Sequence, residues 1–463
     1  MSQKLNTPKG TRDFSSLELK KREYLLNVLK DCFKSFNFQE IQTPSFENLT
    51  TLTGKYGDVE DNLIFKILSS GDKIKKADID AFKNNKLSKF SNSLSDKALR
   101  YDLTVPLSRF ISQNLNNISF PFKRFQTQLV WRAERPQRGR YREFLQCDVD
   151  IIGESNILHE LECIKVYDSV FNRLGLPKVD LRINNRQILE GVSKLMKLET
   201  VTEIASVLDK TDKIGIDGVM KELKDRNLSD DSINLLKSLL DIKGTNQEKI
   251  ENLRTIFDSN NISLNGVDLL DEIIYTSQKF NLNNINIKVD LSLARGLSYY
   301  TGTIIEVSSP KEYEIGSIGG GGRYDDLVQK NNPKLSGFGI SFGFDRIFMI
   351  LDELRLFPNE LNSSKSFLFL NFGLELDSIL SYLDKLREKN ITCELYPSNV
   401  KIKKQLDYAN QKGIDYVVII GDEEVKSNIF KLKNMKSGSQ SSIDISNLLS
   451  EIESISWSDY TIF

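Results

Sequence analysis

The sequence is poor in residues from which many active sites are built. Its 463 residues include one histidine, His159, four cysteines and two tryptophans. With a single histidine, we expect no zinc motif of the HExxH kind, no cysteine–histidine dyad and no HRD loop of the protein kinases. His159 lies in ILHELE, which predicts an ordinary helix residue. If the chain is an enzyme, it must work with arginine, carboxylates and bound substrates.

The cysteines and the apolar residues limit where the protein works. No two of Cys32, Cys147, Cys163 and Cys393 stand at the spacing of a metal-binding or redox motif, which indicates reduced thiols and a cytoplasmic location. The N-terminal residues contain no apolar core of a signal peptide, and no stretch approaches the roughly 20 apolar residues that cross a membrane. The net charge is only -1, so a nucleic-acid partner would have to meet local basic patches.

The pattern of elements divides the chain into four stretches. Residues 1–177 mix helices and strands, and within them the polar segment 72–97 predicts an exposed, mobile insert. Residues 178–285 are rich in Leu, Lys and Asp and predict a mainly helical region. Residues 286–357 return to strand-like runs with dense glycine. Residues 365–463 alternate strands with helices, which predicts a separate small α/β domain.

The segment from Phe120 to Gly153 predicts an antiparallel hairpin. Polar and apolar side chains alternate on both arms, and the turn ERPQRGRYRE between them is rich in arginine. The polar face comprises Arg124, Gln126, Gln128, Arg132, Glu134, Gln146, Asp148 and Asp150. Arginine presents a fixed fork of donors that suits phosphates and carboxylates. The spacing alone leaves two interpretations open, a floor that binds a ligand and a solvated sheet face with a basic turn.

The sequence WRAERPQRGRYREFLQCDVDIIG closely resembles motif 2 of class II aminoacyl-tRNA synthetases, in the version carried by histidyl-tRNA synthetases. The HIGH and KMSKS motifs of class I enzymes are missing. The resemblance implies that Arg132 grips the α-phosphate of ATP and the substrate carboxylate, and that Glu134 contacts the adenine amino group. It also implies that the loop 135–142, with Arg140, touches the outer phosphates and the acceptor end of tRNA.

The same resemblance implies a histidine pocket. Gln146 would hold the α-amino group of histidine, and Asp150 would read its imidazole. In RYDLTVP, Asp102 and Thr104 flank Leu103 and would share a face if this segment is a strand. The family uses this acid and threonine for the α-amino group. Many bacterial members have glutamate at the acid position, so Asp102 follows the other common form.

The run LARGLSYYTGTIIEV looks by itself like the start of a strand with core aromatics, but it resembles a motif peculiar to histidyl-tRNA synthetases. The resemblance implies that Arg295 acts on the α-phosphate, as a metal ion does in related enzymes, and that Tyr299 and Tyr300 line the histidine pocket. The usual form has aspartate where this chain has Ser298. That departure puts the hydrogen bonding at this position in doubt.

Two glycine-rich segments complete the resemblance to a catalytic core. GFGISFGFDRIFMIL resembles motif 3, a strand and a helix whose Arg346 would bind the γ-phosphate. It also matches the GxSxG elbow of α/β-hydrolases at Ser341, but that fold needs a histidine after the serine, and His159 precedes it. GSIGGGGRYDDLV lets backbone approach a ligand closely, and the family places GGGRYD beneath the amino-acid pocket.

The resemblance covers nearly the whole chain and is weakest over 60–97 and 200–285. PKGTRDF matches an N-terminal signature, and the helix expected over 17–36, with a short strand at IQTPSFE, matches motif 1, which builds the dimer interface of the family. In the family the C-terminal domain binds the anticodon. The resemblance therefore implies that the lysines of KIKKQ (401–405) and KLKNMK (431–436) contact tRNA phosphates.

The implied protein has an α+β fold, with an antiparallel-sheet class II catalytic domain, a mainly helical insertion and a C-terminal α/β anticodon-binding domain. It would be a homodimeric histidine–tRNA ligase that uses L-histidine, ATP with Mg2+ and tRNA(His). The alternative is a non-catalytic relative, either a regulatory subunit of ATP phosphoribosyltransferase or the synthetase-like part of a kinase. The first typically lacks the C-terminal domain, and no kinase motif is present here.

Overall fold

The structure is a computed structural model of the whole chain. It describes residues 5–55, 61–294, 299–313, 315–329, 332–358, 361, 365–373 and 376–457. The chain forms two compact units, Met1–Leu356 and Phe357–Phe463, and each is described by itself. Within the described residues, no helix combines the length and the apolar character needed to cross a membrane.

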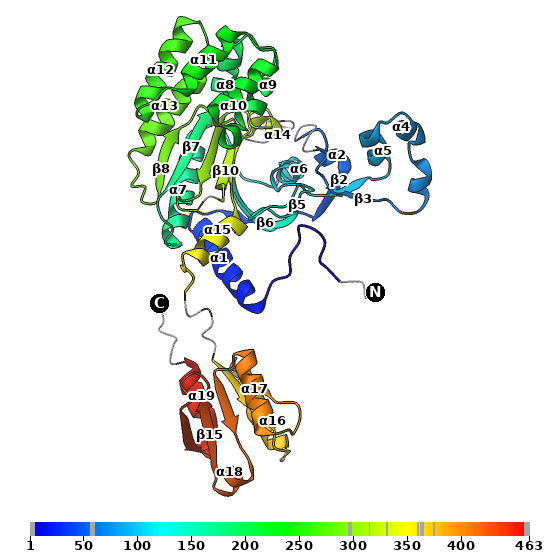
Figure 1. Cartoon of the computed structure of the whole chain (residues 1–463), viewed down its shortest axis with the longest axis vertical. Coiled ribbons are helices and arrows are strands. Elements are labelled where there is room, and N and C mark those ends of the chain that lie inside the picture. The colour runs from blue at the N-terminus through cyan, green and yellow to red at the C-terminus, as the bar shows by residue number, and fades with distance from the viewer. Residues whose placement is uncertain are drawn as a thin grey trace. The chain divides into compact units, whose positions relative to one another are not determined.

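The first unit is built around an eight-stranded sheet with the order β1-β5-β6-β11-β10-β9-β7-β8 (Figure 1). The neighbours from β5 to β7 run antiparallel, whereas the edge pairs β1·β5 and β7·β8 are parallel. The α+β class with a largely antiparallel sheet is therefore confirmed. The strands are β1 (Gln39–Glu40), β5 (Phe122–Trp131), β6 (Glu143–Gly153), β11 (Ser336–Phe342), β10 (Ser317–Arg323), β9 (Thr303–Ser308), β7 (Val179–Asn185) and β8 (Ile285–Val289).

The apolar side of this sheet is covered by three helices, α1 (Ser16–Ser35), α7 (Leu158–Arg173) and α15 (Phe344–Glu353). The ring of Phe33 in α1 lies 5.5 Å from that of Phe125 in β5 and 5.4 Å from that of Phe342 in β11. Because side chains alternate along a strand, the polar neighbours of Phe125 must face the other way. The helix expected over 17–36 is confirmed by α1.

A group of helices connects β7 to β8. Strand β7 falls within the stretch 178–285 that the sequence predicted to be mainly helical, yet it pairs with β8 and β9 in the large sheet. The helices gather beside these strands in Figure 1. They are α8 (Arg186–Leu195), α9 (Val201–Leu208), α10 (Thr211–Asp225), α11 (Asp230–Leu240), α12 (Asn246–Ser259) and α13 (Asn265–Ser277).

The polar segment 72–97, which the sequence predicted to be an exposed, mobile insert, is largely exposed but contains regular secondary structure. It contains η1 (Gly71–Lys76), α4 (Ile79–Lys83), α5 (Leu87–Ser93) and the start of β4 (Lys97–Leu99). Asp78 caps α4 by accepting a hydrogen bond of 2.8 Å from the backbone N–H of Ala81, and the rings of Phe82 and Phe90 lie 5.0 Å apart. Strand β4 pairs with β2 (Phe46–Asn48) and β3 (Lys66–Ile67) in a small sheet. These local caps and ring contacts order a segment whose composition alone suggested disorder.

Among the described residues, the first unit also contains α2 (Leu49–Leu52), α6 (Thr104–Asn114) and α14 (Asp325–Gln329). The last two matter most, because each begins beside residues that the sequence assigned to the ligand pocket.

The second unit is a five-stranded sheet with the order β13-β12-β14-β15-β16. Its elements are β12 (Ser366–Phe369), α16 (Leu376–Glu388), β13 (Thr392–Leu395), α17 (Ile402–Lys412), β14 (Tyr416–Ile419), α18 (Asp422–Lys426), β15 (Ile429–Asn434), β16 (Gln440–Asp444), η3 (Ile445–Asn447) and α19 (Leu448–Trp457). Phe367 and Phe369 join one apolar cluster with α16 and α19, while Leu368 and Leu370 join another with α17. Both faces of this sheet are therefore packed, as the predicted α/β pattern requires.

Candidate active site

The hairpin predicted from residues 120–153 is confirmed, and its register aligns the polar side chains in pairs. Arg124 stands opposite Asp150, Gln126 opposite Asp148, and Gln128 opposite Gln146. We call these six residues the floor. The interpretation as a solvated face is wrong for most of the floor, because Arg124, Gln126, Gln146, Asp148 and Asp150 are all buried.

A cavity of about 840 Å³ lies over the floor. The predicted site residues that line it are Thr104, Arg132, Glu134, Arg140, Gln146, Asp150, Tyr299, Tyr300 and Arg346. Arg295 and Ser298 lie outside the described residues. Residues far apart in the sequence thus meet at one hollow large enough for a nucleotide beside an amino acid.

Arginines line the cavity, among them Arg132, Arg140 and Arg346. The guanidinium of Arg132 lies 4.5 Å from the centre of the Tyr101 ring, and its Nε donates a hydrogen bond of 3.0 Å to the Tyr101 carbonyl oxygen. Arg140 forms an ion pair with Glu134. Arg346 donates from Nη1 to the Ser317 carbonyl oxygen at 2.6 Å. These guanidinium groups are held at the cavity wall, which suits a polyphosphate.

The cavity wall also contains the buried acids Asp148 and Asp150. Asp150 Oδ2 lies 2.7 Å from Nη2 of Arg124, and Asp150 Oδ1 accepts a hydrogen bond from the Tyr324 hydroxyl. Burial raises the pKa of Asp150, and the Arg124 guanidinium opposes that rise. Gly339 makes room for this acid, because a Cβ added there would stand 2.0 Å from Asp150 Oδ1. The carboxyl group is therefore held rigidly with one face toward the cavity.

Sequence reasoning gave no individual role to Arg124, Asp148 and Tyr324, although Arg124 and Tyr324 contact Asp150 and Asp148 lines the cavity. Arg124 and Asp148 already stood on the predicted polar face, so the spacing of two was the available signal. Tyr324 lies in GGGRYD, which the resemblance placed beneath the pocket, but its bond to Asp150 depends on strand pairing. The partners of these side chains could not be read from the sequence.

Asp102 and Thr104 do not lie on a strand, so the argument that they share a strand face is wrong. Thr104 is the first residue of α6, and Asp102 Oδ1 accepts a hydrogen bond of 3.1 Å from the backbone N–H of Val105. Pro106 is tolerated because N–H groups in the first turn have no partner within the helix. Asp102 Oδ2 accepts a hydrogen bond of 3.0 Å from the Tyr299 hydroxyl. Asp102 and Leu103 lie behind the cavity wall, whereas Thr104 reaches it.

Comparison with known proteins decides the family. The model of the histidyl-tRNA synthetase family matches residues 80–347, and that of the anticodon binding domain matches residues 376–455. A histidine–tRNA ligase of Christiangramia forsetii is 48% identical over 97% of this chain and 99% of its own length. One from Flavobacterium johnsoniae is 45% identical over 97% and 99%. The chain belongs to the histidyl-tRNA synthetase family.

The solved structures agree with this membership. The histidyl-tRNA synthetase from Nostoc sp. PCC 7120 superposes with a TM-score of 0.74, at 26% identity, over 98% of this chain and 99% of that one. The apo enzyme from S. aureus superposes with a TM-score of 0.64 at 20% identity, which shows a common fold. The match to the anticodon binding domain covers the part of the chain that the regulatory alternative would lack.

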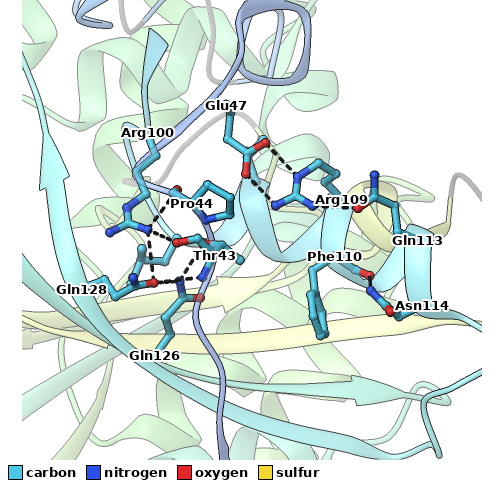
Figure 2. Close-up of polar contacts among 12 residues, drawn as sticks. Thr43, Pro44, Glu47, Arg100, Arg109, Phe110, Gln113, Asn114, Gln126 and Gln128 are labelled. Atoms are coloured by element: carbon cyan, nitrogen blue, oxygen red, sulfur yellow. Dashed lines mark hydrogen bonds and ion pairs between the residues drawn. The ribbon is translucent and has the colours of Figure 1, made fainter. Parts of the chain in front are cut away.

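In this member of the histidyl-tRNA synthetase family, a second buried arginine supports the floor from its edge. Figure 2 shows Arg100 donating to the carbonyl oxygens of Thr43 and Pro44, at 2.7 and 3.1 Å, and to Gln128 Oε1 at 3.1 Å. Gln126 Nε2 donates to Thr43 Oγ1 at 2.8 Å. Burial lowers the pKa of Arg100 to about 10. The strand expected at IQTPSFE is wrong over 41–45, because Thr43 and Pro44 form their hydrogen bonds with side chains of the floor and of Arg100, and β2 begins only at Phe46.

Proposed function

We propose that the cavity over the floor is where this histidine–tRNA ligase activates L-histidine with ATP and then loads it onto tRNA(His). The ligase function comes with the family, and the location of the reaction is the proposal. The observation that carries it is the single cavity that predicted residues from five separate segments line together. Its arginines suit the nucleotide, and its buried acids suit an amino acid with two basic groups.

In the first step, the carboxylate of histidine attacks the α-phosphorus of ATP in line. Pyrophosphate leaves, and histidyl-adenylate forms. Arg132 meets the charge that develops on the α-phosphate, and Arg346 receives the outer phosphates. We propose that Mg2+ arrives as part of the nucleotide substrate and that Arg295 acts on the α-phosphate. No side chain is needed as a nucleophile, in keeping with a chain that contains one histidine.

In the second step, the terminal ribose hydroxyl of tRNA attacks the adenylate carbonyl carbon, and AMP leaves. Glu134 and Arg140 pair with each other here. ATP would separate them, because Glu134 would turn to the adenine amino group and Arg140 to phosphate. We further propose that the lysines of 401–405 and 431–436 contact the anticodon arm, that α1 contributes to a homodimer, and that the protein works in the cytoplasm.

Selection of histidine rests on Asp150. The Asp150 carboxylate accepts a hydrogen bond from an N–H of the imidazole, while Arg124 and Tyr324 hold the carboxylate in place. An analogue without that N–H would leave a buried acid without its partner. The cost of that loss discriminates strongly against such a ligand.

The test is histidine-dependent exchange of pyrophosphate into ATP. Arg132→Ala should lower the exchange rate by about 10²–10³-fold, because one charged donor at the reacting phosphate is lost. Arg295→Ala should abolish exchange for the same reason. Arg387→Ala changes an exposed arginine of the second unit and should leave exchange unchanged. Near-normal exchange in a folded Arg132→Ala protein would contradict the proposed site, and charging of total tRNA with each amino acid in turn would test the substrate.

A further inference from the structure

The N-terminal signature PKGTRDF has no role in the proposed function, yet it lies against the loop 135–142. The backbone N–H of Arg142 donates a hydrogen bond of 2.8 Å to the Gly10 carbonyl oxygen. The carbonyl oxygen of Arg142 accepts one of 2.9 Å from the backbone N–H of Arg132. Nε of Arg142 donates to the Glu134 carbonyl oxygen at 3.1 Å. Arg142 therefore connects the N-terminal segment to two residues that line the cavity.

The turn at Gly10 fits closely against this loop. Gly10 has a φ of +87°, which favours glycine. A Cβ added there would stand 2.8 Å from Arg142 Cγ and 2.9 Å from Pro136 Cγ, closer than carbon atoms pack. Thr11 closes the turn, since its backbone N–H and its hydroxyl both donate to the Pro8 carbonyl oxygen, at 3.1 and 2.8 Å. This turn fixes the direction in which the Gly10 carbonyl oxygen points.

Arg12 joins the same loop to α15. Its guanidinium lies 4.4 Å from the centre of the Tyr141 ring. Its Nη2 lies 3.8 Å from Asp345 Oδ1, and its Nη1 lies 3.4 Å from Glu18 Oε1. Tyr141 and Asp345 both line the cavity, whereas Arg12 is not among the described residues that do so. Arg12 therefore stands behind the cavity wall and connects two parts of it.

The end of the segment that is farther along the chain is fixed to the core of the first unit. The centre of the Phe14 ring lies 4.8 Å from the guanidinium of Arg12 and 4.3 Å from that of Arg22 in α1. Nη1 of Arg22 donates to Asp345 Oδ1 at 2.6 Å, and the two side chains are only 12% and 9% exposed. Residues 10–14 are thus held between α1 and α15, and they can hold the loop in turn.

We propose that residues 10–14 form a strap that keeps the loop 135–142 at the cavity wall, with Gly10 and Arg12 as positioning residues for ATP. A loop that is held in its binding conformation before ATP arrives costs less free energy to order. The effect falls on the nucleotide, because Asp150, which selects the imidazole, lies on β6 outside the loop. The inference rests on the proposed function, since that function assigns the loop to ATP.

The kinetics of pyrophosphate exchange by the full-length protein test this role. Arg12→Ala should raise the KM for ATP about three- to tenfold, because a cation–π contact and partly exposed ion pairs each contribute little alone. Gly10→Ala should raise it about tenfold or more, since the added Cβ displaces the loop. Both variants should leave the KM for histidine within about twofold. Lys9→Ala changes an exposed neighbour of Gly10, and as the matched control it should change neither KM.

Trypsin tests the strap without any catalysis by the protein itself. Arg138 and Arg140 have exposed side chains on the loop, 66% and 43% accessible. In the full-length protein without ligands, Arg12→Ala and Gly10→Ala should speed cleavage after these two arginines about fivefold or more, because cleavage follows opening of the loop. Cleavage within the second unit should keep its rate, and Lys9→Ala should match the unchanged protein.

The outcomes separate the strap from the proposed function. Unchanged cleavage of the loop in both variants would overturn the strap. A KM for histidine that rises as much as the KM for ATP would overturn its role in positioning, because the whole site would then be disturbed. Faster cleavage with an unchanged KM for ATP would instead contradict the assignment of the loop to ATP. If Gly10→Ala does not fold, Arg12→Ala carries the test alone.

Discussion

The two sheets of this protein use their faces in different ways. In the second unit, apolar side chains of β12 pack on both faces, against α16 and α19 on one side and α17 on the other. In the first unit, α1, α7 and α15 cover the apolar side of β5, β6 and β11. The opposite side carries the floor under a cavity, and α6 and α14 pack against it at Phe122 and Ile152. Where helices cover both faces of a sheet, only the outer surface of the domain is left for recognition. A sheet with one polar face can instead enclose a substrate.

The buried polar groups differ in the same manner. Gln405 in the second unit is fully buried, and its amide donates to two carbonyl oxygens and accepts from the backbone N–H of Asn371. On the floor, Gln146 and Asp148 each keep a buried oxygen without a partner. A satisfied buried group stabilises the fold, and an unsatisfied one beside a cavity marks where a ligand completes the structure.

The largest effect on stability should come from Arg100. Arg100→Met should lower the free energy of unfolding by about 3–5 kcal/mol, because the carbonyl oxygens of Thr43, Pro44 and Leu129 and the amide of Gln128 lose their donor. Gln405→Met should cost about 1–3 kcal/mol, since only neutral hydrogen bonds are lost. Urea denaturation followed by circular dichroism measures both. A larger loss of unfolding free energy for Gln405→Met than for Arg100→Met would contradict this ranking.

Glycines of the first sheet should give an intermediate effect. Gly339→Ala places a Cβ 2.0 Å from Asp150 Oδ1, so it should displace the acid and raise the KM for histidine by about tenfold or more. It should also lower the melting temperature, while the KM for ATP changes little. Gly320→Ala is the matched change on the next strand, where the Cβ meets no atom closer than 3.5 Å. It should therefore keep the melting temperature, and a loss equal to that of Gly339→Ala would argue against the close approach at Asp150.

The smallest effect should come from the surface of the second unit. Lys403 and Lys404 are exposed at the start of α17. Replacing both by alanine should weaken aminoacylation of tRNA by about two- to tenfold and reduce its dependence on salt, because two phosphate contacts are lost. Exchange of pyrophosphate should not change. Lys385→Ala, which changes an exposed lysine of α16 in the same unit, is the control, and an equal loss there would argue against a specific RNA surface on α17.

Much of the site could be predicted, because the alternation of polar and apolar residues along the hairpin is visible in a single sequence. The register that pairs Arg124 with Asp150 follows from an alternating hairpin, and the family motifs supplied Arg132 and Arg346. The alternating pattern led to wrong predictions of strands where local hydrogen bonds fix another backbone conformation. Asp102 starts a helix by accepting from Val105, and the segment after β1 gives its carbonyl oxygens to Arg100 rather than to a strand. Likewise, β7 joined the large sheet although the residues after it are helical.

By itself, the sequence determined the polar and apolar faces of the hairpin, the C-terminal α/β domain with its own sheet and the membership of its family. These depend on residue type and spacing along the chain, which any reader of the sequence can see. The tertiary structure alone decided which buried charges have partners. Strand β11 brings Gly339 and Ser341 beside two acids of β6, and its pairing with β10 places the Tyr324 hydroxyl at Asp150. Hydrogen bonds between distant strands depend on distances that no local pattern encodes.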